Sequence, residues 1–313
     1  MSRPAVDAWS LADIPDQAGR TAVVTGPSVG GLGHHTALEL ARRGARVVLA
    51  GRTPAKLDET ASAITAEVPG ARLERLVLDL SSFESVRHAG GEAARLGPID
   101  LLVNNAGVMG TSRRRTDDGL DLQLATNHFG PFLLTGLLLP QLVASEAATV
   151  VTVSSIYHRY GRAPLGDPTS SRRGVYRKWR TYGHSKLANL LFTHELDRRC
   201  REAGEPVKAL AAHPGIAGTH LAANGRYGSS SGGVASIVDA AVRAVSQPAA
   251  LGAWPTLMAA TADLPGGTFV GPGGPAELGG TPQVTTGNRR SRDADDARRL
   301  WELSERTTGI SYP

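Results

Sequence analysis

Short runs of β-branched and other apolar residues alternate along the chain with longer stretches in which apolar residues recur at helical spacing. Several runs are apolar on both faces, which is typical of strands in a parallel sheet that helices cover on both sides. The repeated order of strand, helix and strand predicts an α/β fold with a doubly wound parallel sheet. The predicted strands are Thr21–Thr25, Arg46–Ala50, Leu73–Leu80, Ile99–Val103, Thr149–Val153 and Val207–Ala212.

Three helical stretches stand out in the same pattern. The stretch Gly33–Gly44 follows the first predicted strand and ends at a glycine, a common helix stop. The stretch Phe129–Ala144 is strongly apolar but short and interrupted by prolines, which predicts a buried helix and not a membrane span. The last stretch, Asp293–Arg306, places Leu300 and Trp301 on one face, so we expect the C-terminus to fold back and dock.

Strand and helix signals continue without a break from residue 20 to about residue 250, which favours one domain. We assign residues 1–18 to an N-terminal extension and residues 19–313 to this domain. Clusters of Gly, Ser, Pro or basic residues make three segments look inserted or mobile. These segments are Arg159–Arg180, Gly218–Gly233 and Pro265–Gly287, the last of which opens a C-terminal segment of residues 265–313.

The composition excludes several classes of protein. The chain has 34 basic and 29 acidic side chains, but the two kinds are interleaved and only 5% of residues are aromatic, which argues against nucleic-acid binding. The single cysteine, Cys200, cannot form an intramolecular disulfide and is expected to be a small apolar side chain in a reducing cytoplasm. The first residues lack the apolar run of a secretory signal, and the histidines lack metal-ligand spacing. We therefore expect a cytoplasmic protein without a metal site.

A glycine-rich turn, Thr25–Gly33, joins the first predicted strand to the first helix. Glycines there permit a tight turn, and the helix N-terminus offers N–H groups to a pyrophosphate. A turn that merely needs positive φ is the alternative. At the end of the second strand the chain reads Gly51-Arg52, where a site for NAD would have an acidic residue. Arg52 instead favours the 2′-phosphate of NADP(H), with NAD(H) or a solvated arginine as the alternatives.

Candidate proton-transfer residues come later in the chain. Ser155 follows the fifth strand, and Tyr182 and Lys186 share one helix face at positions i and i+4. A phenol has a pKa near ~10, so acid–base work near neutrality requires lowering it by roughly 3 units. A nearby ammonium and a nicotinamide cation are suitable sources of that shift.

Taken together, these motifs resemble the short-chain dehydrogenase/reductase family, in its single-domain branch with a Tyr-x-x-x-Lys pair. The resemblance extends from about Gly19 to Thr219 and implies a Rossmann-type fold. It rests on Gly26, Gly31, Gly33, Asp79, Asn104, Asn105, Ala106, Gly107, Asn127, Ser155, Tyr182, Lys186, Pro214, Gly215 and Thr219.

The resemblance implies a role for each matching residue. Tyr182 would exchange the proton with the substrate oxygen, Ser155 would orient that oxygen, and Lys186 would hold the nicotinamide ribose and depress the Tyr182 pKa. Asn127 would position a water that links Lys186 to solvent; an Asn that caps or kinks a helix is the alternative. The implied cofactor-binding set is Gly26, Ser28, Gly31, Leu32, Gly33, Arg52, Asp79, Leu80, Asn105, Ala106, Gly107, Tyr182, Lys186, Pro214, Gly215, Ile216 and Thr219.

The sequence departs from the family pattern in two places. The glycine-rich turn has one extra residue, which we assign to an enlarged loop at Gly30. The interval of 27 residues between Ser155 and Tyr182 is longer than in compact members and is similar to that of the retinol dehydrogenase and protochlorophyllide reductase subset, whose members often take bulky apolar substrates. The segment 218–233 corresponds to a mobile substrate lid in the family. Arg113, Arg114 and Arg115 we assign to the surface.

The combined expectation is an NADP(H)-dependent oxidoreductase that interconverts a carbonyl and an alcohol on a small or medium apolar molecule. The alternative is a regulatory or scaffold protein that keeps the fold and the cofactor but has little turnover. The resemblance also implies a homodimer through the helices that carry Asn127 and Tyr182, although the long insert would obstruct that contact. The basic residues of the insert would attract an anionic substrate or an acidic carrier protein, and a solvated loop is the reading we favour. These residues are Arg159, Arg162, Arg172, Arg173, Arg177, Lys178 and Arg180.

Overall fold

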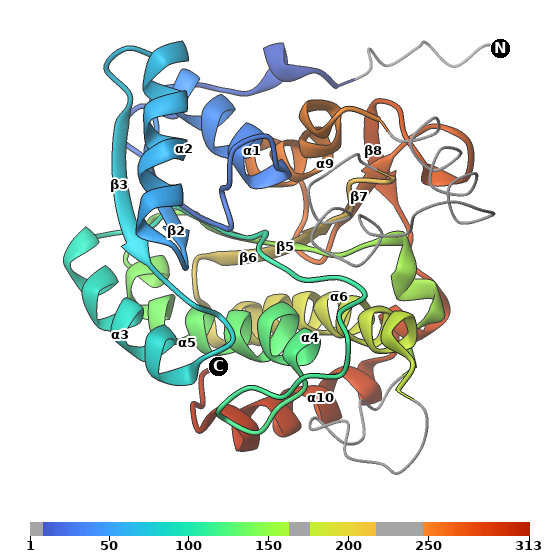
Figure 1. The fold of residues 1–313 in the computed structure, drawn as a ribbon. Helices are drawn as coiled ribbons and strands as arrows, with labels where there is room; N and C mark the ends of the chain where they lie inside the picture. The colour runs from blue at the N-terminus through green and yellow to red at the C-terminus, as the bar shows by residue number, and fades with distance from the viewer. Residues whose placement is uncertain (1–8, 163–175, 217–246) are drawn as a thin grey trace, which may run out of the picture.

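The computed structural model describes residues 9–162, 176–216 and 247–313, and it is built around one eight-stranded sheet (Figure 1). The strand order is β3-β2-β1-β4-β5-β6-β7-β8; the first seven strands run parallel and β8 runs antiparallel to β7. The predicted doubly wound sheet is confirmed. The strands are β1 (Thr21–Thr25), β2 (Arg46–Gly51), β3 (Arg72–Val77), β4 (Leu101–Asn104), β5 (Ala148–Val153), β6 (Val207–Ala212), β7 (Phe269–Pro272) and β8 (Pro282–Thr285).

Helices cover both faces of the sheet (Figure 1). One layer consists of α1, α2 and α9, and the other of α3, α5 and α6, with α10 packed on the outside of α6. The bounds are α1 (Leu32–Arg42), α2 (Pro54–Glu67), α3 (Phe83–Ala93), α4 (Leu122–Leu124), α5 (Gly130–Val143), α6 (Lys178–Ala203), α9 (Ala249–Thr261) and α10 (Ala294–Thr308). Among the described residues, no helix combines the length and the apolar character needed to cross a membrane.

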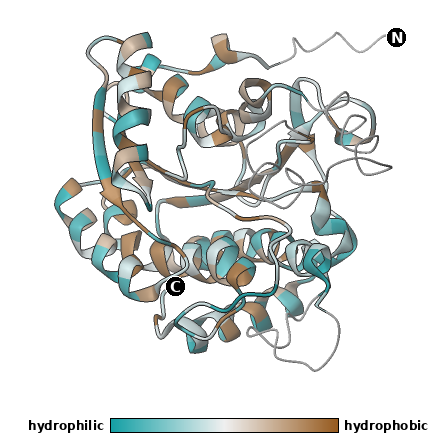
Figure 2. Ribbon diagram, in the orientation of Figure 1, coloured by the Kyte–Doolittle hydropathy of each residue, from teal (hydrophilic) through white to brown (hydrophobic). Residues whose placement is uncertain are grey.

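The strands that are apolar on both faces contribute side chains to two separate hydrophobic cores, one on each face of the sheet. In β1, Val23 packs into the core under α3, α5 and α6, whereas Ala22 and Val24 pack into the core under α1, α2 and α9. This alternation follows from the two-residue period of a strand. Apolar residues accordingly concentrate along the sheet and on the inner sides of the helices (Figure 2).

The apolar stretch near residue 130 and the C-terminus behave as predicted. Helix α5 is buried along most of its length, and Leu300 and Trp301 of α10 are buried against the rest of the protein. Cys200 is fully buried on α6, and this burial raises the pKa of its thiol to about 11. The cysteine is therefore the apolar packing residue that the sequence predicted.

Two sequence predictions about the sheet are wrong in detail. The third strand ends at Val77 and not at Leu80, because the Asp79 carboxylate accepts hydrogen bonds from the backbone N–H and hydroxyl of Ser81 and turns the chain toward α3. The Gly- and Pro-rich segment 265–287 is not an insertion. It supplies β7 and β8, and Phe269 and Val270 of β7 are buried.

Candidate active site

The glycine-rich turn between β1 and α1 requires glycine at two points because the backbone passes close to its neighbours. Gly26 has φ +66°, and a Cβ there would lie 2.9 Å from the Cα atom of Ala106. A Cβ at Gly33 would lie 2.5 Å from Nδ2 of Asn105 and 2.6 Å from the carbonyl oxygen of Gly26. A side chain at either position would push the turn away from the end of β4.

The extra residue of this turn is absorbed before α1 begins. Gly30 has φ +74°, and its N–H donates to Nδ1 of His34 at 3.4 Å. The N–H of Gly31 donates to the carbonyl of Ser28 at 2.9 Å. Gly31 is the N-cap residue of α1 and has no side chain to cap the helix. The first-turn N–H groups of α1 are therefore available to an anion.

Asn105 holds the ends of β1 and β4 together beside the turn. Its Nδ2 donates to the carbonyl of Thr25 at 2.8 Å and to that of Gly26 at 3.2 Å. In return, the Thr25 hydroxyl accepts hydrogen bonds from the backbone N–H groups of Asn105 and Ala106, each at 3.0 Å. Asn105 thus shapes the glycine-rich turn from the neighbouring strand.

A cavity of about 530 Å³ lies along the carboxyl edge of the sheet, within the size range of ligand pockets. The turn, the end of β2, the segment after β3 and the segment after β4 all contribute to its wall. Ten of the predicted cofactor-binding residues line it: Gly26, Ser28, Gly31, Leu32, Arg52, Asp79, Leu80, Asn105, Ala106 and Gly107.

The other predicted residues lie elsewhere. Gly33 packs the helix against the turn, and Pro214, Gly215 and Ile216 follow β6, away from the cavity wall. Thr219 and the predicted lid 218–233 lie outside the described residues.

One end of the cavity is basic. Arg52 follows β2 and its guanidinium lies 3.8 Å from the carboxylate of Asp79, and Lys56 lines the wall nearby. Arg114 and Arg115 are exposed, as the sequence predicted, and they also line the same cavity. The loop after β4 folds back on itself, because the N–H of Leu122 donates to the carbonyl of Arg114. The run of three arginines in the sequence was the signal available for a basic cavity wall, but only the folded loop shows which of these side chains line the cavity.

Asn127 lies in a π-helical turn, η3 (Ala125–Phe129), between α4 and α5. Its side-chain amide makes two hydrogen bonds with the backbone of Val108. Oδ1 accepts from the N–H at 2.8 Å, and Nδ2 donates to the carbonyl at 2.9 Å. Its Nδ2 also donates to the hydroxyl of Ser185 on α6 at 2.9 Å. A Cβ on Gly107 would lie 3.1 Å from Oδ1 of Asn127, so this side chain lies next to Gly107 of the cavity wall.

Ser155, Tyr182 and Lys186 come together where β5 ends against α6. Ser155 hydrogen-bonds to the phenol of Tyr182, and Nζ of Lys186 donates to the carbonyl of Val153 at 2.9 Å. The Lys186 ammonium lies 5.8 Å from the centre of the Tyr182 ring. The structure therefore brings these three predicted side chains to one place beside Asn127.

The electrostatics of this group differ from the expectation of a lowered phenol pKa. Burial raises the pKa of Tyr182 to about 12, against a lowering effect of the hydrogen bond with Ser155. Burial also lowers the pKa of Lys186 to about 8. The desolvation of both groups outweighs their mutual influence because the ammonium is directed to the carbonyl of Val153. In this state Tyr182 is a protonated phenol and can donate to an oxygen.

An aromatic cluster that the sequence analysis missed borders Tyr182. The ring of Tyr157 lies 5.6 Å from that of Tyr182 and stacks on Trp179 at 5.5 Å. Tyr157 and Trp179 are half-buried, and Trp179 also packs against Gly110. Tyr157 comes only two residues after Ser155, which was the signal available in the sequence.

Comparison with known proteins gives consistent results. The family model for short chain dehydrogenases matches residues 20–230. The chain is 36% identical to human retinol dehydrogenase 13, over 97% of this chain and 88% of that protein, and 38% identical to mouse polyprenol dehydrogenase, over 95% and 86%. A crystal structure of an uncharacterized protein from Mycobacterium paratuberculosis is 42% identical and superposes with a TM-score of 0.78, covering 98% of this chain and 99% of that one.

Proposed function

The chain belongs to the short-chain dehydrogenase family and is an NAD(P)-dependent oxidoreductase of CH–OH and C=O groups; we propose that it prefers NADP(H) and acts on a small or medium apolar substrate. The observation that carries the cofactor preference is the basic end of the cavity, where Arg52 and Lys56 line the wall. A 2′-phosphate is a dianion at neutral pH and needs cationic partners. NAD(H) in the same cavity would leave these cations without that partner.

The residues of the cavity fit a dinucleotide in two respects. The first N–H groups of α1 have no side-chain cap and are available to an anion, and the wall carries both cationic and apolar side chains. In addition, the buried hydroxyls of Thr111 and Thr126, which both line the cavity, have no hydrogen-bond partner among the described residues. Buried polar groups are normally satisfied, so these hydroxyls indicate a polar ligand.

A bound nicotinamide dinucleotide supplies or accepts the hydride. The chain's own residues then control the substrate oxygen: Tyr182 donates a proton to it during carbonyl reduction, and Ser155 orients it by hydrogen bonding. Lys186, charged below pH about 8, stabilises the phenolate that Tyr182 becomes. Asn127 fixes the backbone of Val108 between the cavity and this group. Proton transfer and cofactor binding are thus adjacent.

The aromatic cluster supports an apolar substrate. Tyr157 and Trp179 present half-buried rings next to the proton donor, where they would contact the carbon skeleton of a bound alcohol or carbonyl compound. The matching relatives are named for retinol and polyprenol, which are both apolar alcohols.

A cytoplasmic location remains part of this proposal, supported by the single cysteine. The homodimer also stays a prediction; α10 packs on α6 and α5, the helices such a contact would use.

A fluorescence titration with NADPH and NADH in parallel tests the cofactor preference. We expect NADPH to bind more tightly in the wild type, and Arg52→Ala to reduce this preference by about tenfold, the equivalent of ~1.4 kcal/mol. Arg87→Ala is the matched control, because Arg87 bonds the carbonyl of Thr308 and does not line the cavity. An unchanged preference in Arg52→Ala would refute the assignment of Arg52.

Tyr182→Phe tests the catalytic assignment. The variant is expected to bind NADPH as the wild type does but to lose turnover of ketone and aldehyde substrates, because only the proton donor is removed. Full activity of the variant would contradict the role of Tyr182. A wild-type protein that binds NADPH but turns over no such substrate would favour the regulatory or scaffold alternative.

A further inference from the structure

A turn formed by residues 274–278, between β7 and β8, contacts the segments that follow β5 and β6. It contains Ala276 with φ +52° and Glu277 with φ +59°, and these are the non-glycine residues of the described chain that adopt positive φ. Such a conformation costs free energy for a residue with a side chain and persists where surrounding contacts hold it. The contacts made by Glu277 identify what holds it here.

The carboxylate of Glu277 has three partners from three elements. Its Oε2 lies 3.0 Å from Nε2 of His213, which follows β6, and its Oε1 lies 3.0 Å from the guanidinium of Arg159. Oε1 also accepts a hydrogen bond from the hydroxyl of Thr285 on β8 at 2.8 Å. Glu277 therefore links the end of β6 to η4 (Ile156–Tyr160), the 3-10 turn that follows Ser155.

The proton positions on His213 are fixed by its neighbours. The backbone N–H of Gly215 donates to Nδ1 at 3.2 Å, so Nε2 carries the proton and donates to Glu277. His213 is fully buried, and a Cβ on Gly271 would lie 2.1 Å from its Nε2. The imidazole has no room to turn, and the position of Gly215 follows from the position of Glu277.

The backbone of the same turn holds the next residue. The carbonyl of Leu278 accepts from the N–H of Ile216 at 2.8 Å, and a Cβ on Gly215 would lie 2.5 Å from that carbonyl oxygen. The segment 213–216 is thus fixed by a side-chain contact at one end and a backbone contact at the other.

The contact with Arg159 connects Glu277 to the turn η4, which begins directly after Ser155. Ser155 is the N-cap residue of η4, and Nδ1 of His158 in that turn donates to the carbonyl of Ser155 at 2.8 Å. Since β5 and β6 are parallel neighbours in the sheet, the segments that follow them leave it side by side at its carboxyl edge, the edge along which the cavity lies. Hydrogen bonds from His213 and Thr285 and the charge of Arg159 lower the pKa of Glu277 to about 2, so its charge is present throughout the working pH range.

We propose that Glu277 is a positioning residue, whose carboxylate fixes the segment after Ser155 and the segment at Gly215 relative to each other so that the reactive end of the cofactor meets the proton donor. The proposal rests on the proposed function. It assigns no contact between Glu277 and the cofactor or the substrate.

Glu277→Gln removes the charge and one acceptor while keeping the size of the side chain. We expect it to lower kcat at least tenfold with a smaller change in the KM of the carbonyl substrate. We also expect affinity for NADPH to fall several-fold while affinity for adenosine 2′,5′-bisphosphate, a fragment without nicotinamide, stays unchanged. That fragment reports on the basic end near Arg52, which follows β2, and β2 is separated from β6 by three strands. Glu302→Gln, on the exposed side of α10, is the matched control.

Three outcomes separate the possibilities. Wild-type kcat and NADPH affinity in Glu277→Gln would overturn the proposal, and equal weakening of both ligands would overturn it in favour of a purely structural role. Failure of the wild type itself to bind NADPH would instead refute the proposed function.

Arg159→Gln, a change at a half-exposed side chain, is the second variant if Glu277→Gln does not fold. It should weaken NADPH and spare the fragment in the same way; a wild-type profile in it would count against the proposal.

Discussion

Tyr182 and Lys186 are buried side by side, and burial acts on them in opposite directions. It raises the pKa of the phenol to about 12 and lowers that of the ammonium to about 8. In the proposed mechanism the phenol is therefore protonated and able to donate up to pH about 12, while the Lys186 charge that would stabilise its phenolate is lost above pH about 8. The pH dependence of carbonyl reduction should consequently report on Lys186 and not on Tyr182.

We expect kcat/KM for carbonyl reduction to be level from about pH 6.5 to 7.5 and to fall above pH about 8, up to tenfold per pH unit. A pH–rate profile of kcat/KM measures this because it reports ionisations of the free enzyme. Tyr160→Phe, which alters an exposed phenol on the neighbouring turn, should keep the profile unchanged. A profile that stays level up to pH 10 would show that the charge of Lys186 is not needed.

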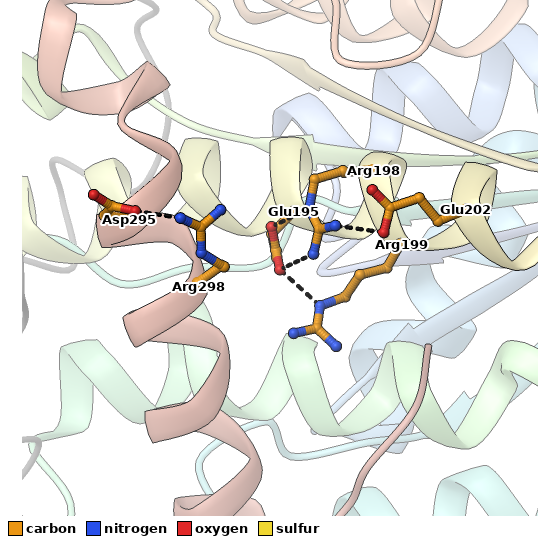
Figure 3. Close-up of polar contacts among 6 residues, drawn as sticks. All are labelled: Glu195, Arg198, Arg199, Glu202, Asp295 and Arg298. Carbon is orange, nitrogen blue, oxygen red and sulfur yellow. Dashed lines mark hydrogen bonds and ion pairs between the residues drawn. The ribbon is translucent and has the colours of Figure 1, made fainter.

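At the scale of elements, α10 is held on α6 by both apolar and charged contacts. Glu195 of α6 is 2% exposed and accepts hydrogen bonds from Arg198 at 2.7 and 2.9 Å and from Arg199 at 2.7 Å (Figure 3). The guanidinium of Arg199 in turn lies 4.6 Å from the ring centre of Trp301 on α10. The buried carboxylate thus orients the cation that covers the docked tryptophan.

Glu195→Gln is expected to lower the free energy of unfolding by about 2 kcal/mol, because two arginines lose a buried counter-charge. Glu202→Gln on the same helix is the matched control, since Glu202 is paired with Arg198 but is 63% exposed and should change stability by less than about 0.5 kcal/mol. Urea unfolding of the two variants and the wild type measures the difference. Equal losses in both variants would contradict a special role for the buried carboxylate.

The elements also show which features a linear pattern can predict. The central strands were predictable because a buried parallel strand is apolar on both faces whatever its neighbours are. Strands β7 and β8 have only four residues each and contain Gly or Pro, so their pairing depends on β6 and leaves no periodic signal. The π-helical turn at Asn127 was hidden for a related reason, because it is a local insertion within an otherwise helical pattern.

The residues of the candidate site also fall into those that the sequence pattern could predict and those that it could not. The glycine-rich turn, Ser155, Tyr182 and Lys186 are tied to strand ends and helix spacing, so a sequence with these elements locates them. Arg114, which lines the cavity, and Glu277, which contacts His213, lie in segments whose course depends on contacts with distant parts of the chain. The raised pKa of Tyr182 was unpredictable as well, because burial is a property of the packed fold.

At the scale of the whole molecule, packing keeps histidines uncharged inside the protein, which makes stability depend on pH. His128 is 1% exposed among the rings of Phe129, Phe132 and Phe192, and burial lowers its pKa to about 3; burial lowers the pKa of His158 to about 4. Unfolding restores a pKa near 6.5, so the unfolded state binds more protons than the folded state between pH 6.5 and 4. Stability is therefore full above pH 6.5 and is lost as the pH falls.

Each of these two histidines should contribute a slope of about 1.4 kcal/mol per pH unit to the free energy of unfolding in that window. His128→Leu should remove one such slope, and the Ser304 hydroxyl it contacts remains bonded to the carbonyl of Leu300. His88→Leu, at a side chain that is 73% exposed, controls for the loss of an imidazole. Urea unfolding at pH 4.5, 5.5 and 6.5 measures the slopes. Identical slopes in His128→Leu and the wild type would mean that His128 is already charged in the folded protein, which its apolar surroundings argue against.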